Sequence, residues 1–315
     1  MCIRDRGGRV KIIYMGTPEF AVKPFEKLAD NFEVVLAVTN EDKSSGRGKK
    51  ITMPPVKKAA LERNIEVFQP KNVNSSDSIE YLKSFNADLV VVCAYGKILR
   101  NGILNLTGYN PVNIHASILP KLRGAAPINF AIINGDKEAG VSIMKVEEGL
   151  DTGDYSLVGK TEIGKKNVEE LEEELSEMGA DLIVEFVNRF IDGNLNWTKQ
   201  NDEESTYAPK ISKDFGYLDF TSMDKNYIER LSRGLTKKNG ISILYDGNRI
   251  KLDEIEVSEG KGELGEVLES SSYLEIATKD GSIKAHRLQW PGKKMMDAED
   301  FFRGRKIEKG SIIGC

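Results

Sequence analysis

Apolar residues in the first 190 positions form short continuous runs, which are separated by longer segments of mixed polarity. Continuous apolar runs bounded by glycine, proline or asparagine are typical of buried β-strands. We expect strands at 10–14, 33–39, 65–68, 88–94, 112–115, 140–146 and 155–163. Residues 88–94 (DLVVVCA) form the most continuous of these runs, which predicts a central strand that is covered on both faces.

Segments with helical spacing lie between these strands. We expect helices from Pro55 to about Arg63, and at 76–85, 126–133 and 167–190. The longest begins with Asn167 and Glu170, the spacing of a capping box. Strands that alternate with helices predict a Rossmann-like, open and largely parallel α/β sheet. Ligands bind to such sheets beyond the carboxyl ends of the strands.

The pattern changes after residue 194. Residues 195–212 are polar and lack periodicity, which predicts a linker. A helix at 225–235 is followed only by short strands with glycine turns, at 240–245, 250–255, 265–268, 273–278 and 283–288, a pattern typical of a small barrel. We therefore predict a disordered or non-native extension at 1–9, an α/β domain at 10–194, the linker, and a β-barrel domain at 213–315.

Composition narrows the choice of function. The net charge of −4 predicts no general attraction to nucleic acid, so any such binding needs a local basic patch. The three cysteines (Cys2, Cys93 and Cys315) have no metal-binding spacing and suit a reducing cytoplasm. No apolar run reaches membrane-spanning length. We expect a cytoplasmic protein with no bound metal and no membrane partner.

The strand at 112–115 carries the first candidate chemistry. Side chains alternate along a strand, so Asn113 and His115 share one face. An amide and an imidazole together suit a reaction in which a carbonyl oxygen becomes negative and protons move. The alternative is that Asn113 caps a turn and His115 is a satisfied core histidine.

A second candidate is Asp151, in the sequence GLDTGD. The flanking glycines Gly149 and Gly153 allow a tight turn that exposes the carboxylate. Placed beside His115, this carboxylate would fix the orientation of the imidazole. A simple glycine-rich turn between two strands is the alternative interpretation.

Several motifs together resemble those of the 10-formyltetrahydrofolate-dependent formyltransferases. The strongest are NIHASILPKLRGAAPI at 113–128 and GLDTGD at 149–154. Further matches are GTPEFA at 16–21, SGRGKKI at 45–51, PPVKKAA at 54–60, VFQP at 67–70, ADLVVVCAYGKIL at 87–99 and LQWPGKKMMDAEDF at 288–301. The basic loop and the PGKK sequence are similar to the branch of the family that acts on tRNA. The resemblance covers residues 10 to about 313.

This resemblance implies formyl transfer from 10-formyltetrahydrofolate to the α-amino group of methionine on initiator methionyl-tRNA. Asn113 would donate a hydrogen bond to the developing oxyanion, His115 would stabilise it and carry protons, and Asp151 would position His115 or a water. The implied folate contacts are Ala94, Tyr95, Gly96, Ser117, Ile118, Leu119 and Pro120. The implied tRNA contacts are Lys43, Arg47, Lys49 and Lys50 in a loop at the acceptor end, and Lys237, Lys238, Lys293 and Lys294 on an OB-like barrel.

The chain departs from the family pattern in several places. Glu41 and Lys43 stand where a proline and an arginine are common, Ala116 stands where glycine is frequent, and Arg100 replaces a usual proline. Residues 234–240 also lack the expected Asn-Pro segment. We expect a monomer. The alternatives are a sugar-nucleotide N-formyltransferase and a non-catalytic module that binds tRNA or folate.

Overall fold

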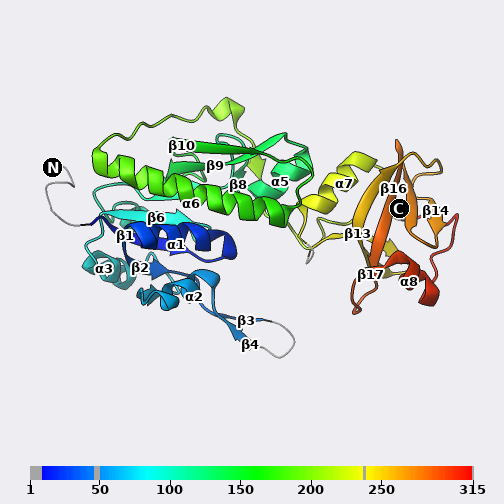
Figure 1. Cartoon of the computed structure of the whole chain (residues 1–315), viewed down its shortest axis with the longest axis horizontal. Helices are drawn as coiled ribbons and strands as arrows, with labels where there is room; N and C mark the ends of the chain where they lie inside the picture. The colour runs from blue at the N-terminus through cyan, green and yellow to red at the C-terminus, as the bar shows by residue number, and fades with distance from the viewer. Residues whose placement is uncertain (1–8, 46–49, 237–238, 314–315) are drawn as a thin grey trace. The chain divides into compact units, whose positions relative to one another are not determined.

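The computed structural model describes residues 9–45, 50–236 and 239–313, and its chain divides into two compact units (Figure 1). The first unit comprises residues up to 127, 138–162 and 171–208, and the second comprises 128–137, 163–170 and the residues from 209 onward. The four-part division expected from the sequence stays a prediction. It differs from these units because 195–208 lie in the first unit, whereas 128–137 and 163–170 lie in the second.

The first unit is organised by a seven-stranded sheet with the order β10-β9-β7-β6-β1-β2-β5. Its strands are β1 (Lys11–Gly16), β2 (Glu33–Val38), β5 (Val67–Phe68), β6 (Leu89–Cys93), β7 (Val112–His115), β9 (Glu138–Lys145) and β10 (Tyr155–Glu162). The pairs from β5 to β7 are parallel, and the pairs β7/β9 and β9/β10 are antiparallel. The predicted largely parallel sheet is therefore confirmed. β6 is its central strand, and all five residues of β6 are buried.

Helices cover this sheet. They are η2 (Glu19–Ala21), α1 (Val22–Asn31), α2 (Pro55–Glu62), α3 (Ser76–Ser84), α4 (Asn101–Leu104) and α6 (Val168–Asp192), whereas α5 (Pro127–Asn134) belongs to the second unit from residue 128 onward. Figure 1 shows α1 and α6 on the same side of the sheet. Their contact includes ion pairs from Lys23 and Lys27 to Glu177, each 3.6 Å long. The predicted capping box at the start of α6 is present, because Asn167 and Glu170 bond each other's backbone N–H groups.

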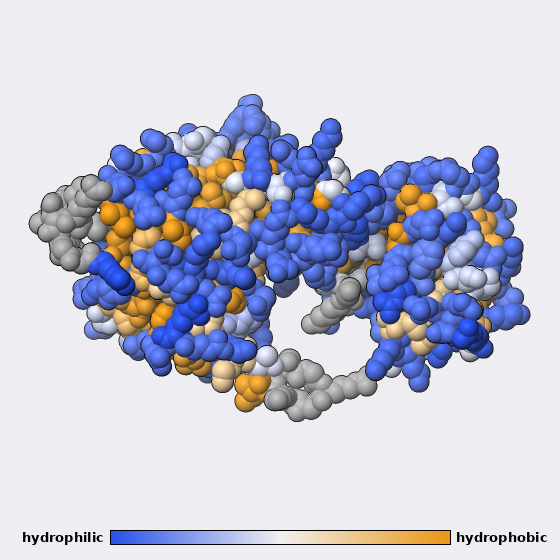
Figure 2. Space-filling view, viewed as in Figure 1, coloured by the Kyte–Doolittle hydropathy of each residue, from blue (hydrophilic) through white to orange (hydrophobic). Residues whose placement is uncertain are grey.

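Short elements complete the described residues of the first unit. They are the hairpin strands β3 (Lys43–Ser45) and β4 (Lys50–Thr52), the paired strands β8 (Arg123–Gly124) and β11 (Tyr207–Ala208), and the 3₁₀ turn η3 (Asp202–Glu204). Apolar side chains from alternate strand positions form a core on one side of the sheet, including Ile13, Leu36 and Val90. The visible surface in Figure 2 is mostly hydrophilic, as the amphipathic helices require.

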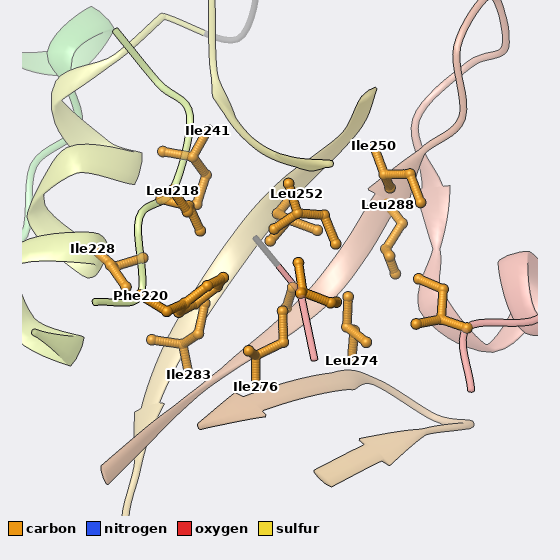
Figure 3. Packing of buried hydrophobic residues seen from close by; sticks show 14 of the residues in the cluster. Leu218, Phe220, Ile228, Ile241, Ile250, Leu252, Leu274, Ile276, Ile283 and Leu288 are labelled. Carbon is orange, nitrogen blue, oxygen red and sulfur yellow. The ribbon is translucent and has the colours of Figure 1, made fainter. Parts of the chain in front are cut away.

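The second unit contains an antiparallel sheet with its own core. The strand order is β12 (Ile241–Tyr245), β13 (Asn248–Ser258), β16 (Gly281–Gln289), β15 (Leu274–Thr278) and β14 (Val267–Ser270), with β17 (Met296–Asp297) paired to β16. Figure 3 shows Leu252, Ile276 and Ile283 pointing from these strands toward Phe220. The helices α7 (Lys225–Gly234) and α8 (Ala298–Gly304) add Ile228 and Phe301 to this core. The predicted small barrel is confirmed as an antiparallel half-barrel.

Gly140 allows β9 and β10 to approach closely, and this gives a test of the packing. A Cβ atom at Gly140 would lie 2.2 Å from the Gly159 backbone oxygen and 2.7 Å from Ile118 Cγ1. We predict that Gly140→Ala lowers the free energy of unfolding by about 1–3 kcal/mol through overpacking, as measured by urea denaturation. Gly108→Ala is the control, because a Cβ there has no neighbour within 4 Å and the change should stay within about 0.5 kcal/mol. Equal losses in both variants would contradict this prediction.

Candidate active site

Asn113 and His115 lie at the carboxyl end of β7, between the parallel strand β6 and the antiparallel strand β9. Asn113 is paired with Val92 on one side and Met144 on the other, and His115 is paired with Ser142. The two side chains share one face of the strand, as the sequence predicts. Asn113 is half-buried, and its amide has no hydrogen-bond partner among the described residues. Its N–H groups therefore remain free for a ligand.

The imidazole of His115 is held in one orientation. Its Nε2 atom lies 3.0 Å from the Leu122 carbonyl oxygen, and the side chain is only 5% exposed. A carbonyl oxygen can only accept a hydrogen bond, so Nε2 carries a proton and donates it. The Nδ1 atom is consequently the ring position at which a proton is gained or lost.

Asp151 lies next to that second ring nitrogen. Its Oδ2 atom is 3.8 Å from His115 Nδ1, which is within ion-pair distance but longer than a hydrogen bond. The carboxylate also accepts a hydrogen bond of 2.9 Å from the Gly124 backbone N–H. Asp151 has a left-handed backbone, with φ of 52°, in the turn between β9 and β10. The structure thus brings together two side chains that are 36 positions apart in the sequence.

The predicted folate contacts at 117–120 form the turn that follows β7. Ser117 is buried, and its hydroxyl donates to the Lys121 carbonyl oxygen at 2.6 Å. Ser142 of β9 holds the turn by two hydrogen bonds. Its hydroxyl donates to the Ser117 carbonyl oxygen and accepts from the Leu119 N–H. The peptide bond between Leu119 and Pro120 is cis. The hydrogen bonds of Ser142 hold this turn, and the Ser117 hydroxyl is already used within it.

The predicted folate contacts at 94–96 follow β6 and lie at the same edge of the sheet. Ala94 and Gly96 have left-handed φ values of 47° and 77°. The Tyr95 carbonyl oxygen accepts a hydrogen bond of 2.8 Å from the Asn40 amide. The Tyr95 ring points into the core, where its hydroxyl has no partner among the described residues, and burial raises the pKa of Tyr95 to about 12. This segment can offer backbone groups, but not its aromatic ring, to a ligand.

A polar network that the sequence analysis missed supports the base of the β3–β4 hairpin. Lys57 of α2 donates to both carboxylate oxygens of Asp42, at 2.9 and 2.8 Å, and to Gln69 at 2.8 Å. Gln69 in turn donates to Asp42 and to the Asn40 carbonyl oxygen. The hydrogen bonds from Lys57 and Gln69 hold the pKa of Asp42 below its usual value. The network connects this hairpin to the carboxyl edge of the sheet.

The predicted tRNA contacts are only partly described. Arg47, Lys49, Lys237 and Lys238 lie outside the described residues. Lys43 is exposed on β3, and Lys50 begins β4. Lys293 and Lys294 are exposed in the loop between β16 and β17.

A separate cavity of about 230 Å³ lies at the other end of the same strands. Leu89 and Val112, which begin β6 and β7, line it together with Phe186 and Trp197. Because parallel strands run from this end toward His115, the cavity is distinct from the cluster around that residue.

In the part of the chain that the structure describes, no group of three or more metal-ligating side chains is gathered. No helix among the described residues is both long and apolar enough to span a membrane.

Two family profiles match the two parts of the chain. The profile of the formyl transferases matches residues 9–187, and that of the formyl transferase C-terminal domain matches residues 210–306. The methionyl-tRNA formyltransferase of Clostridium tetani is 39% identical to this chain over 309 residues, which cover 96% of this chain and 99% of that protein. The protein of the same name from Caldanaerobacter subterraneus is 40% identical over 96% of this chain and 100% of its own length.

Solved structures show the same fold at lower identity. HypX from Aquifex aeolicus in complex with tetrahydrofolic acid has a TM-score of 0.62 and 18% identity, over 93% of this chain and 46% of HypX. The sugar 3N-formyl transferase WlaRD, solved with dTDP and 5-N-formyl-THF, has a TM-score of 0.65 and 19% identity, over 91% of this chain and 99% of that protein.

Proposed function

Because this chain belongs to the formyl transferase family, we propose that it transfers the formyl group of 10-formyltetrahydrofolate to the α-amino group of methionine on initiator methionyl-tRNA. Relatives that carry this name match both units of the chain at about 40% identity. The observation that carries the chemistry is the approach of Asp151 to within 3.8 Å of His115, on the strand face of β7 that Asn113 shares. In our proposal the protein is a monomer that works in the cytoplasm, without a membrane partner or a bound metal.

Asn113 is suited to stabilise the charge that develops during the transfer. When the amine attacks the formyl carbon, the carbon becomes tetrahedral and its oxygen becomes negative. The unpaired amide of the half-buried Asn113 can donate to this oxygen. A donor that is already in place needs little reorganisation at the moment of reaction.

His115 and Asp151 are suited to move the proton. The attacking amine must lose a proton, and N10 of the folate must gain one when it leaves. Because Nε2 of His115 is held by Leu122, proton exchange is confined to Nδ1. The Asp151 carboxylate, 3.8 Å away, stabilises the imidazolium that forms when Nδ1 is protonated. The side chains thus perform separate tasks, with charge stabilisation at Asn113 and proton transfer at His115.

The two turns at the edge of the sheet fit the folate. The pterin ring is planar and presents donors and acceptors at its edge, so exposed backbone groups suit it. Left-handed residues at Ala94 and Gly96 turn the backbone at this edge. In the second turn, which Ser142 holds by hydrogen bonds, the partly exposed Ile118 and Pro120 offer apolar surface, whereas Leu119 is buried beneath them. When bound there, the folate supplies the formyl group.

The tRNA contacts rest on local charge. The chain has a net charge of −4, so a phosphate backbone must be attracted by particular groups of lysine and arginine residues. The proposed contacts on the hairpin are Lys43, Arg47, Lys49 and Lys50, and those on the second unit are Lys237, Lys238, Lys293 and Lys294.

The alternatives explain less of the chain. The likeness to a sugar formyltransferase rests on 19% identity, which shows the fold alone. A module that only binds tRNA or folate would not need His115 and Asp151 within ion-pair distance.

The acceptor is tested by competition. The purified protein is incubated with 10-formyltetrahydrofolate and either methionyl-tRNA or dTDP-linked amino sugars, and the formylated products are measured. We predict product with methionyl-tRNA only. Product with the amino sugar alone would overturn the proposed acceptor, and product with neither would overturn the activity.

The roles of Asn113 and His115 are tested by truncation. We predict that Asn113→Ala lowers kcat by about 10²–10³-fold, because one oxyanion donor is lost, and that His115→Ala lowers it at least as much. Binding of tRNA, measured by filter retention, should not change. Asn31→Ala is a matched control, since Asn31 is exposed and caps only the Lys27 carbonyl oxygen of its own helix. A near-normal kcat in Asn113→Ala would remove the oxyanion role.

The charge contribution is tested by the salt dependence of tRNA binding. Each phosphate contact contributes about −0.9 to the slope of log K against log salt concentration. We predict that replacing Lys293 and Lys294 together by Ala weakens binding and reduces that slope by about 1–2. Replacing the exposed Lys71 and Lys83 by Ala removes the same charge elsewhere and should leave the slope unchanged. Equal slopes for both double variants would show that only net charge matters.

A further inference from the structure

Most of the segment expected to be a linker is paired with the first unit, at Thr198 and at β11. Thr198 exchanges two backbone hydrogen bonds with Tyr155, of 2.8 and 3.1 Å. Ten residues later, β11 pairs in parallel with β8. The chain from Thr198 to Ala208 therefore runs along the first unit as a strap, although nothing in its hydrophobic pattern predicts this.

Gln200, in this strap, holds the turn that carries Asp151. Its amide N–H groups donate to the Asp151 and Gly153 carbonyl oxygens, at 2.9 and 2.7 Å. Its oxygen accepts from Arg123 Nε at 3.0 Å, so each polar atom of the amide has a partner. Gln200 is only 6% exposed, and loss of these bonds would leave buried polar groups unpaired. The residue it supports has a left-handed backbone, a conformation that persists only where its surroundings enforce it.

Thr206, in the same strap, holds the residue that orients His115. Its hydroxyl accepts from the Leu122 N–H at 2.8 Å. Leu122 also has a left-handed backbone, with φ of 57°, and its carbonyl oxygen is the partner of His115 Nε2. Leu122 thus connects the Thr206 hydroxyl, through its N–H group, to the His115 ring, through its carbonyl oxygen.

Three consecutive residues carry these connections to the catalytic groups. The Leu122 oxygen binds His115, the Arg123 guanidinium binds Gln200, and the Gly124 N–H binds the Asp151 carboxylate. Each of the three is also held by the strap. A Cβ atom at Gly124 would lie 2.7 Å from the Ala208 oxygen, so the strap lies directly against this backbone. Both catalytic groups are therefore placed by one short parallel pair, β8 and β11.

We propose that Gln200 and Thr206 are positioning residues that set the separation between His115 Nδ1 and Asp151. Neither touches the reacting atoms, so they act on proton transfer through His115 and Asp151. The expected effect on kcat rests on the proposed formyl transfer. The expected effect on the orientation of the His115 ring does not depend on the reaction.

The kinetic arm of the test uses isosteric variants. Gln200→Glu keeps the acceptor for Arg123 and loses the paired donors, and Thr206→Val loses the hydroxyl. We predict that each lowers kcat about 10–100-fold, because a displacement of about 1 Å at a catalytic group costs about that much. KM for methionyl-tRNA and for the folate should change less than about threefold, and Thr206→Ser should restore kcat. Each kcat is calculated per folded protein, because a general loss of stability would also lower the apparent kcat without changing KM.

Thr161→Val is the matched control. The Thr161 hydroxyl also donates a hydrogen bond within the first unit, to Glu174, but it belongs to β10 and takes no part in the site. Its kcat should equal that of the wild-type protein. A kcat in Gln200→Glu and Thr206→Val that also equals the wild-type value would overturn the inference.

The second experiment measures the environment of the His115 ring directly by NMR. The chain has only two histidines, so nitrogen-15 labelling of histidine gives signals from His115 and His286 alone. We predict that the His115 Nε2–H signal shifts or is lost in Thr206→Val and is retained in Thr206→Ser, while His286 is unchanged in both. If the wild-type protein forms no product, the proposed function fails, and this arm still decides the inference. An unchanged His115 signal in Thr206→Val would overturn it.

Discussion

The hydrogen bond from His115 Nε2 to the Leu122 carbonyl oxygen is the interaction on which the site depends. It determines which ring nitrogen carries the fixed proton and, therefore, which one faces Asp151. Without this partner, no hydrogen bond would oppose a flip of the imidazole that places a ring carbon, rather than Nδ1, beside the carboxylate. One backbone oxygen, 3.0 Å from the ring, thus decides which ring nitrogen is left to face the carboxylate.

The site is built from unfavourable backbone conformations that a rigid sheet supports. Ala94, Leu122 and Asp151 are left-handed residues at its edge, and such residues cost about 1–3 kcal/mol each and persist only where their surroundings enforce them. Hydrogen bonds from Asn40 to Tyr95 and from Gln200 to Asp151 supply the enforcement. The parallel strands of the sheet end at this edge, so these turns are brought to one place.

Local patterns were sufficient for most of the fold. The apolar run at 88–94 predicted the central strand β6, and the capping box at Asn167 predicted the start of α6, because both depend on neighbouring residues. The same is true of Asn113 and His115, whose shared face follows from strand alternation. The polar segment 195–212 shows the limit of this reasoning. Gln200 and Thr206 bond to groups more than 40 positions earlier, and such bonds leave no periodic trace in the sequence.

The sequence by itself thus determined the alternation of strands and helices, the small barrel after residue 212, and the shared strand face of Asn113 and His115. These follow from side-chain polarity and from spacing along one strand or helix. Only the tertiary structure decided that Asp151 faces His115 Nδ1, and that the strap rather than a free linker holds both. The physical reason is that separation along the chain does not specify separation in space. The approach of two turns depends on the register of every strand between them.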